Sequence, residues 1–128
     1  MSMLENKTIL IVDDDPDVVT AIKMSLEEQG AKVVVAADGV VAVEVFEKEK
    51  PDLVVLDMML PKRSGFLVLE RMKAMKLDPP PKVIMITGNL GSRHKSYAMS
   101  MGVADYINKP FRMARLLESI EKLLAPPQ

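Results

Sequence analysis

Five short apolar runs, spread along the whole chain, constrain the fold of this sequence more than any other feature. They are rich in valine and isoleucine, and they are mostly continuous rather than alternating with polar residues. Strands that are buried on both faces of a parallel sheet have this pattern. The predicted strands are residues 8–12, 31–36, 53–56, 83–86 and, with a weaker signal, 106–107.

Segments with helical periodicity separate these runs. The first is the best marked, because Asp15 is a typical N-cap, Pro16 suits the first helical position and Gly30 is a typical stop. The predicted helices are residues 16–29, 40–50, 66–76, 90–101 and 112–124. In the second of these, the apolar residues with helical spacing are Val41, Val45 and Phe46. Strand and helix therefore alternate five times, which predicts an α/β fold with right-handed crossovers and helices on both faces of the sheet.

Length and composition limit the classes of protein to consider. A chain of 128 residues with 48% hydrophobic side chains predicts one domain, residues 1–128, with a core over residues 7–124 and a short tail at 125–128. The absence of cysteine excludes a disulfide scaffold, a thiolate zinc site and a cysteine nucleophile. With no long apolar stretch and no signal-like N-terminus, we expect a cytoplasmic protein without a membrane partner.

Charge is distributed unevenly along the chain. Residues 1–60 carry 5 basic and 13 acidic side chains, whereas residues 61–128 carry 12 basic and 5 acidic ones. This asymmetry predicts an acidic site and a basic face on one molecule, with unevenly charged solvated helices as an equal alternative. We interpret the basic half as a surface for a protein partner or effector rather than for nucleic acid.

The polar residues that end the apolar runs indicate where function lies. The runs end in Asp13-Asp14-Asp15, in Asp57, in Thr87-Gly88 and near Lys109-Pro110. In an open parallel sheet the carboxyl ends of the strands line one crevice, which is where ligands bind. We therefore expect these residues, although distant in sequence, to meet at one edge.

The chemistry of these residues fits phosphoryl transfer. Asp13, Asp14 and Asp57 would repel one another in a partly buried site, and a divalent cation removes that conflict. Oxygen ligands without cysteine or histidine favour Mg²⁺ over zinc. Thr87 offers a hydroxyl and Lys109 a positive charge to phosphoryl oxygens, while Gly88 leaves the pocket unobstructed. A carboxylate in such a set can act as a nucleophile and form an aspartyl phosphate.

At this point the sequence resembles the receiver domain of two-component response regulators. The resemblance runs from about residue 7 to residue 124 and includes four motifs in order: ILIVDDDPDV from residue 9, PDLVVLDMMLP from residue 51, VIMITG from residue 83 and DYINKPF from residue 105. It implies a flavodoxin-like, doubly wound sheet of five parallel strands in the order 2-1-3-4-5 with five helices.

The resemblance implies roles for the acidic residues and their neighbour. Asp57 resembles the phosphoacceptor. Asp14 resembles the direct Mg²⁺ ligand, Asp13 binds the ion directly or through water, and the main-chain carbonyl of Met59 resembles the third protein ligand.

Further roles concern the phosphoryl group once it is bound. Thr87 and Lys109 resemble the hydroxyl and ammonium groups that hold it, and Tyr106 resembles the aromatic switch residue. Lys109-Pro110 resembles the family's cis peptide, which would direct the lysine into the pocket. The implied protein is therefore a switch with slow self-dephosphorylation rather than an enzyme.

The implied partners are a histidine kinase or histidine phosphotransfer protein and a downstream effector or tethered output domain. A phosphorylation-dependent dimer is also implied, but three departures in the last helix argue against the ion-paired dimer of the winged-helix subfamily. These are Arg115, Ser119 and Glu121.

Two alternatives remain open on the residues alone. One is a Mg²⁺-dependent phosphatase of the haloacid-dehalogenase type, which would leave Asp57 unexplained. The other is a receiver-like interaction module that is not phosphorylated, although the residues needed for phosphorylation are all present.

Overall fold

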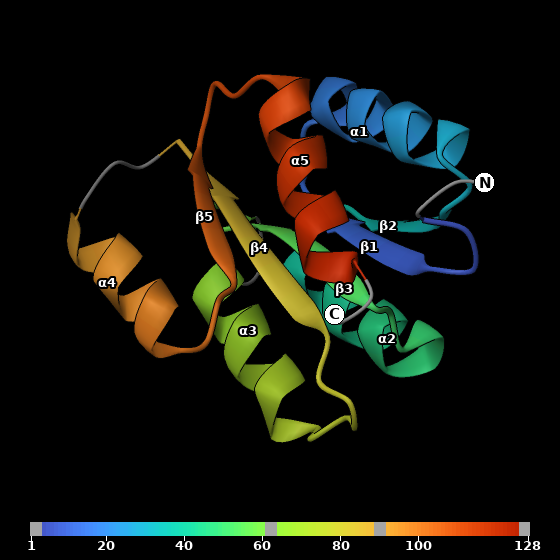
Figure 1. The fold of residues 1–128 in the computed structure, drawn as a ribbon. Helices are drawn as coiled ribbons and strands as arrows, with labels where there is room; N and C mark the ends of the chain where they lie inside the picture. The colour runs from blue at the N-terminus through green and yellow to red at the C-terminus, as the bar shows by residue number, and fades with distance from the viewer. Residues whose placement is uncertain (1–3, 61–63, 89–91, 126–128) are drawn as a thin grey trace.

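Five parallel strands form one sheet in the order β2-β1-β3-β4-β5, and a helix follows each strand along the chain (Figure 1). The computed structural model describes residues 4–60, 64–88 and 92–125. The strands are β1 (Thr8–Val12), β2 (Lys32–Ala36), β3 (Leu53–Asp57), β4 (Lys82–Thr87) and β5 (Asp105–Asn108). The helices are α1 (Pro16–Glu28), α2 (Gly39–Glu49), α3 (Gly65–Ala74), α4 (Ser92–Ser100) and α5 (Met113–Leu124).

This topology confirms the predicted fold class, a doubly wound, flavodoxin-like α/β sheet. The predicted boundaries differ from the observed ones by a few residues at element ends, most of all at β5, which is four residues long rather than two. The start of the fourth predicted helix and the end of the predicted tail, at positions 90–91 and 126–128, lie outside the described residues.

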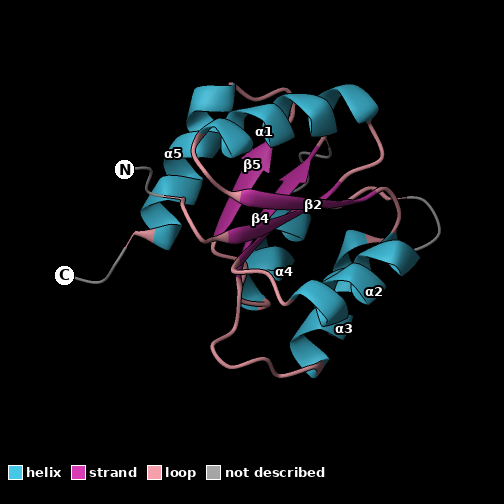
Figure 2. Ribbon diagram, turned by 90° about the vertical axis from the view of Figure 1, so that its right-hand side faces the viewer, coloured by secondary structure: helices cyan, strands magenta, loops and turns pink. Residues whose placement is uncertain are grey.

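Alternate side chains of each strand enter two separate cores. Leu10 and Val12 of β1 pack in a cluster that α2, α3 and α4 cover. Ile9 and Ile11 point the other way, into a cluster that α1 and α5 cover. Successive side chains of a strand point to opposite faces, so a continuous apolar run fills both cores. Figure 2 shows the sheet between these two layers of helices.

Local signals determine where several helices begin and end. The Asp15 carboxylate accepts hydrogen bonds from the main-chain amides of Asp17 and Val18 and so caps α1, as predicted. Asp38 caps α2 in the same way. α3 ends at Ala74, two residues before the end predicted for the third helix.

One predicted core position in α2 is wrong. Helical spacing predicted that Val41 would face the core together with Phe46, but the Val41 side chain is 39% exposed. Phe46 is buried as predicted, and Ala42 and Val43 are buried beside it. Among the described residues, none of the helices combines the length and apolar character that crossing a bilayer requires.

Candidate functional site

The strand register brings the predicted site residues to one edge of the sheet. Val12 pairs with Leu56 across β1 and β3, so Asp13 and Asp57 follow at the same level. Asp57 in turn pairs with Ile86, which places Thr87 one step further on β4. Thr87 pairs with Asn108, and the amide of Lys109 donates to the carbonyl of Thr87 at 2.8 Å. The predicted convergence of the strand ends is therefore observed.

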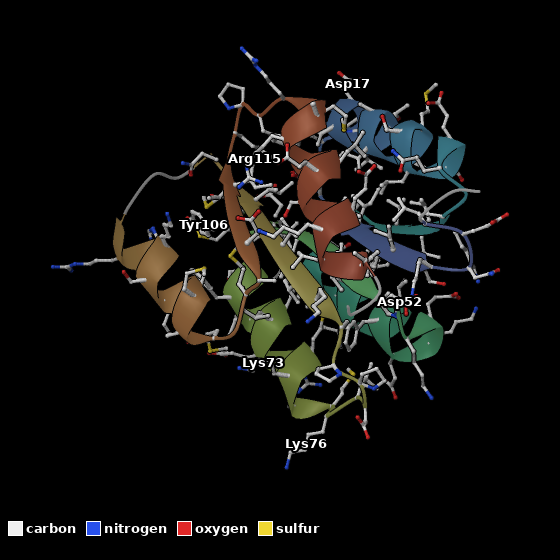
Figure 3. The ribbon with its side chains drawn as sticks, viewed as in Figure 1. Asp17, Asp52, Lys73, Lys76, Tyr106 and Arg115 are labelled. Atoms are coloured by element: carbon white, nitrogen blue, oxygen red, sulfur yellow. The ribbon has the colours of Figure 1, made fainter. Side chains whose placement is uncertain are left out.

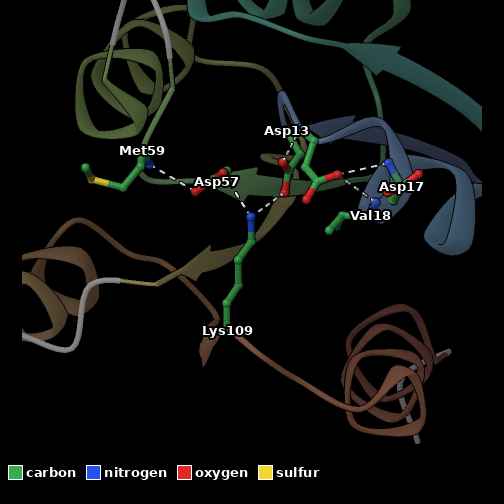
Figure 4. A network of polar contacts seen from close by, with 7 residues as sticks. Asp13, Asp17, Val18, Asp57, Met59 and Lys109 are labelled. Atoms are coloured by element: carbon green, nitrogen blue, oxygen red, sulfur yellow. Dashed lines mark hydrogen bonds and ion pairs between the residues drawn. The ribbon is translucent and has the colours of Figure 1, made fainter.

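A lysine bridges two buried carboxylates at the centre of this edge (Figure 4). The Lys109 Nζ lies 2.9 Å from Asp13 Oδ2 and 3.1 Å from Asp57 Oδ2. The side chains of Asp13 and Asp57 are 0% and 4% exposed, so solvent screens their attraction to Lys109 only weakly. The contact links three segments that are distant in the sequence. The Lys109-Pro110 peptide bond is cis, as the family resemblance implies.

Main-chain amides hold the second oxygen of each carboxylate. Asp57 Oδ1 accepts from the amide of Met59 at 3.0 Å, and Asp13 Oδ1 accepts from the amide of Asp15 at 2.9 Å. Each buried carboxylate is thus bonded on both oxygens, which restricts its rotation. The two side chains are oriented by the loops that leave β1 and β3.

The charges at this site are unequally compensated. Burial raises the pKa of the Asp57 carboxyl above its ordinary value, and the nearby charge of Asp13 raises it further, against the hydrogen bonds from Met59 and Lys109. Burial alone would lower the pKa of the Lys109 ammonium, but its bonds and charge interactions with Asp13 and Asp57 outweigh burial and raise it. One ammonium is shared by two carboxylates, so the lysine stays charged while Asp57 is only partly compensated.

A third carboxylate completes an acidic cluster that fits a divalent cation. Asp13, Asp14 and Asp57 each offer an oxygen, and these oxygens lie within 4.8 Å of one another. Asp14 is exposed, whereas the other two are buried, so the cluster opens to solvent on the Asp14 side. Three carboxylates against one lysine leave excess negative charge, and an all-oxygen set of this kind suits Mg²⁺.

The two remaining predicted residues, Thr87 and Tyr106, lie on the neighbouring strands β4 and β5. Thr87 is fully buried at the end of β4. Tyr106 is half-buried and packs against the core under α2, α3 and α4, and Figure 3 shows it on the α4 side of β5. Burial raises the pKa of its phenol. In the sheet, Tyr106 pairs with Met85, two residues before Thr87 on the neighbouring strand.

Two glycines near the site differ in how tightly they are packed. A β-carbon on Gly65, the first residue of α3, would lie 2.5 Å from the carbonyl oxygen of Asp57 and 2.7 Å from the Cα of Met58. At Gly88, by contrast, a β-carbon would meet no described atom within 4 Å. A side chain at Gly88 would therefore enter open space, and the close approach to backbone atoms occurs at Gly65.

Comparison with known proteins assigns the family. The response regulator receiver domain family matches residues 9–121 of the chain. The chain belongs to the response regulator receiver family. It is 38% identical over 119 residues to the alkaline phosphatase synthesis transcriptional regulatory protein PhoP of Bacillus subtilis (strain 168). The aligned residues cover 93% of this chain and 49% of PhoP.

Two solved receiver domains share its fold. A CheY-like response regulator receiver domain protein from Methanospirillum hungatei JF-1 superposes with a TM-score of 0.84 at 36% identity, covering 92% of this chain and 93% of the other. The second is the receiver domain of the sensor histidine kinase PA1611 from Pseudomonas aeruginosa PAO1, which has a magnesium ion coordinated in its active site cleft. It superposes with a TM-score of 0.81 at 28% sequence identity, and the match covers 92% of this chain and 97% of the other. This receiver chain spans about half the length of the curated relatives it matches.

The receiver domain also contains a polar network that sequence reasoning missed. Arg115 of α5 donates two hydrogen bonds to the carboxylate of Asp105, at 2.9 and 3.1 Å, and the buried Ser119 hydroxyl donates a third at 2.6 Å. Burial raises the pKa of Asp105, but the bonds from Arg115, Ser119 and its neighbour's amide outweigh burial and lower it. Arg115 and Ser119, two of the three departures noted in the last helix, thus take part in an intramolecular contact between β5 and α5.

A second missed contact joins α3 to α4. The Phe66 and Tyr97 rings meet edge to face with centroids 5.0 Å apart, and the Tyr97 hydroxyl donates to Glu70 at 2.9 Å. The sequence contains little indication of this contact, because β4 and its flanking loops separate the two helices along the chain.

Proposed function

We propose that this receiver domain accepts a phosphoryl group on Asp57 from the phosphohistidine of a histidine kinase or a histidine phosphotransfer protein. The observation that supports this role best is the position of Asp57, a buried strand-end carboxylate in contact with Lys109 and beside Asp13 and Asp14. Among the described aspartates, Asp13 shares the contact with Lys109, but Asp57 is the one that faces the adjacent pair Asp13-Asp14 from another strand.

The transfer uses residues in separate tasks. An Asp57 oxygen attacks phosphorus, the phosphorus–nitrogen bond of the phosphohistidine breaks, and its electron pair returns to the imidazole nitrogen, which is reprotonated. The Lys109 ammonium, already within hydrogen-bond distance of Asp57, would bind a phosphoryl oxygen, and the Thr87 hydroxyl would bind another. The protein thereby supplies mainly position and electrostatic stabilisation.

Mg²⁺ is the cation that we propose for the acidic cluster. Asp13, Asp14 and Asp57, with the main-chain carbonyl of Met59, would hold it, since three carboxylate oxygens already lie within 4.8 Å of one another. The magnesium ion of the PA1611 receiver domain supports this choice. When bound, the ion would neutralise charge on the transferring phosphoryl group.

The phosphorylated state would act as a switch, with slow self-dephosphorylation. Thr87 would move toward the phosphoryl group, Tyr106 would follow, and the surface of α4, β5 and α5 would change. A downstream effector or an output domain tethered to residues 125–128 would read this surface. We place this activity in the cytoplasm, with no direct contact between the receiver domain and nucleic acid.

Incubation with acetyl phosphate and Mg²⁺, followed by intact-mass measurement and peptide mapping, tests the proposal. We expect one phosphoryl group on Asp57, and its loss in Asp57→Asn. Asp52→Asn, at the opposite end of the same strand, is the matched control and should still accept one group. Labelling at Asp13 with continuous phosphate release would indicate a phosphatase, and no labelling at all would indicate an interaction module.

A further inference from the structure

A pocket lies at the end of the sheet opposite to the acidic cluster. Its volume is about 360 Å³, and it lies between α3, the loop that leads into β4, and the turn that joins α4 to β5. Lys82 begins β4 and Thr87 ends it, so the pocket and the acidic cluster are separated by about 16 Å along that strand. The pocket is therefore not part of the proposed phosphorylation site.

The floor of the pocket is the hydrophobic core itself. Phe46, Leu69 and Val83, which are at most 7% exposed, line it, together with half-buried apolar side chains such as Leu77 and Met101. Pockets that bind small molecules are commonly of this size and are lined by apolar side chains with a few polar groups. The apolar part of a ligand would find a preformed surface here.

The rim of the pocket is positively charged. Lys73, Lys76 and Lys82 are among the lining residues, and none of the lining residues that the structure describes is acidic. The Lys73 Nζ donates to the carbonyl of Met101 at 2.6 Å and lies 3.6 Å from the position of a β-carbon on Gly102. Figure 3 shows Lys73 on α3 and Lys76 just below the lower end of that helix, and both residues line the pocket.

These lysines have capacity for a ligand. An ammonium carries three donors, and the bond to Met101 uses one of those of Lys73, which leaves the others for an anion at the pocket edge. Lys76 and Lys82 are exposed, and their long side chains can reach across the mouth. Three cations around an apolar cavity complement a ligand that has an apolar body and an anionic head.

We propose that this pocket binds a small amphipathic carboxylate, with its hydrocarbon part against Phe46, Leu69 and Val83 and its carboxylate among the three lysines. The volume of about 360 Å³ suits a small molecule, because pockets that bind small molecules commonly measure about 300–1,000 Å³. The inference is independent of the proposed phosphorylation of Asp57, since it rests on residues at the other end of the sheet.

A series of ligands with equal chain length and different charge tests this inference. The full chain is titrated with octanoate, 1-octanol and octylammonium, and backbone amide shifts are followed by NMR. We expect octanoate to bind most tightly and octylammonium most weakly, with shifts centred on Leu77, Val83 and Met101. Three outcomes would overturn the proposed carboxylate pocket. They are equal affinity for octanoate and octanol, amide shifts centred elsewhere, and concentration-dependent self-association without ligand-specific shifts.

Two double variants separate the effect of the lysines from that of net charge. Lys76→Gln/Lys82→Gln retains the bond from Lys73 to Met101, and it should weaken octanoate binding by about three- to tenfold while leaving octanol binding unchanged. Lys23→Gln/Lys48→Gln removes the same charge from α1 and α2, outside the pocket, and should bind octanoate as the wild type does. Equal weakening in both double variants would contradict a specific carboxylate site.

Discussion

Gly65→Ala should destabilise the protein, although alanine is the better helix former. The added methyl group would lie 2.5 Å from the Asp57 carbonyl oxygen and 2.7 Å from the Met58 Cα, and both of these are backbone atoms that cannot rotate away. The start of α3 must then move away from β3, which lengthens the bond from the Gly65 amide to the Met58 carbonyl, 2.9 Å in the wild type.

The magnitude follows from three effects. Overpacking costs about 1–3 kcal/mol, and loss of the main-chain bond costs about 1 kcal/mol. Alanine recovers at most about 1 kcal/mol of helix propensity, less at a helix end than in its interior. We therefore expect a net loss of about 2 kcal/mol in the free energy of unfolding, which lowers the Tm of a domain of this size by roughly 6–10 °C.

Urea denaturation of the wild type, Gly65→Ala and Gly88→Ala measures this effect. Gly88→Ala is the matched control, because it makes the same change near the same site with no described atom within 4 Å, and it should leave stability within about 0.5 kcal/mol of the wild type. Because the added methyl group presses on the main chain of Asp57 itself, Gly65→Ala should also slow phosphorylation of Asp57. Wild-type stability in Gly65→Ala, or an equal loss in both variants, would refute the steric argument.

Three further predictions concern the metal, the β5–α5 network and the switch. Millimolar Mg²⁺ should raise the Tm of the wild type, because the acidic cluster that we propose as its site exists only in the folded protein. The increase should be much smaller in Asp14→Asn, and an equal increase in both proteins would place the ion elsewhere. The pKa of Asp105 is lowered in the folded protein, so its ionised carboxylate contributes to the free energy of unfolding. This contribution is complete above the unfolded-state pKa of about 3.9, and it is lost as the pH falls through the lower pKa of the folded state. Urea denaturation against pH should therefore show a stability gap between the wild type and Asp105→Asn that closes on acidification below about pH 4, and a gap independent of pH would contradict the contact with Arg115. Thr87→Ala should still accept phosphate on Asp57, but beryllofluoride should no longer shift the amide resonances of Tyr106 and α4, whereas wild-type shifts confined to the acidic cluster would refute the switch.

Much of this fold could be predicted because its signals are local. The strand runs are apolar throughout, and Asp15-Pro16 and Gly30 mark the ends of the first helix by their own backbone preferences. The convergence of Asp13, Asp57 and Lys109 followed from a general property of parallel sheets, because the carboxyl ends of their strands share an edge. The candidate site could therefore be placed before any distance was known.

Packing between distant elements could not be predicted in this way. Helical spacing favoured Val41 as a core residue beside Phe46, but α2 is rotated so that Ala42 is buried with Phe46 instead. The tight packing at Gly65 depends on how closely α3 approaches the end of β3, which no local pattern encodes. A one-residue rotation of a helix changes which side chain is buried, and only the summed fit of all elements selects it.

The amino-acid sequence by itself determined the order of the elements, the edge on which the polar residues meet and the chemistry those residues can perform. The tertiary structure alone decided which charges pair: Lys109 with two carboxylates at once, and Arg115 with Asp105 across β5 and α5. It also decided that three lysines surround an apolar pocket. Periodicity and capping act between residues close in the chain, whereas these pairings depend on distances set by the packing of helices on the sheet.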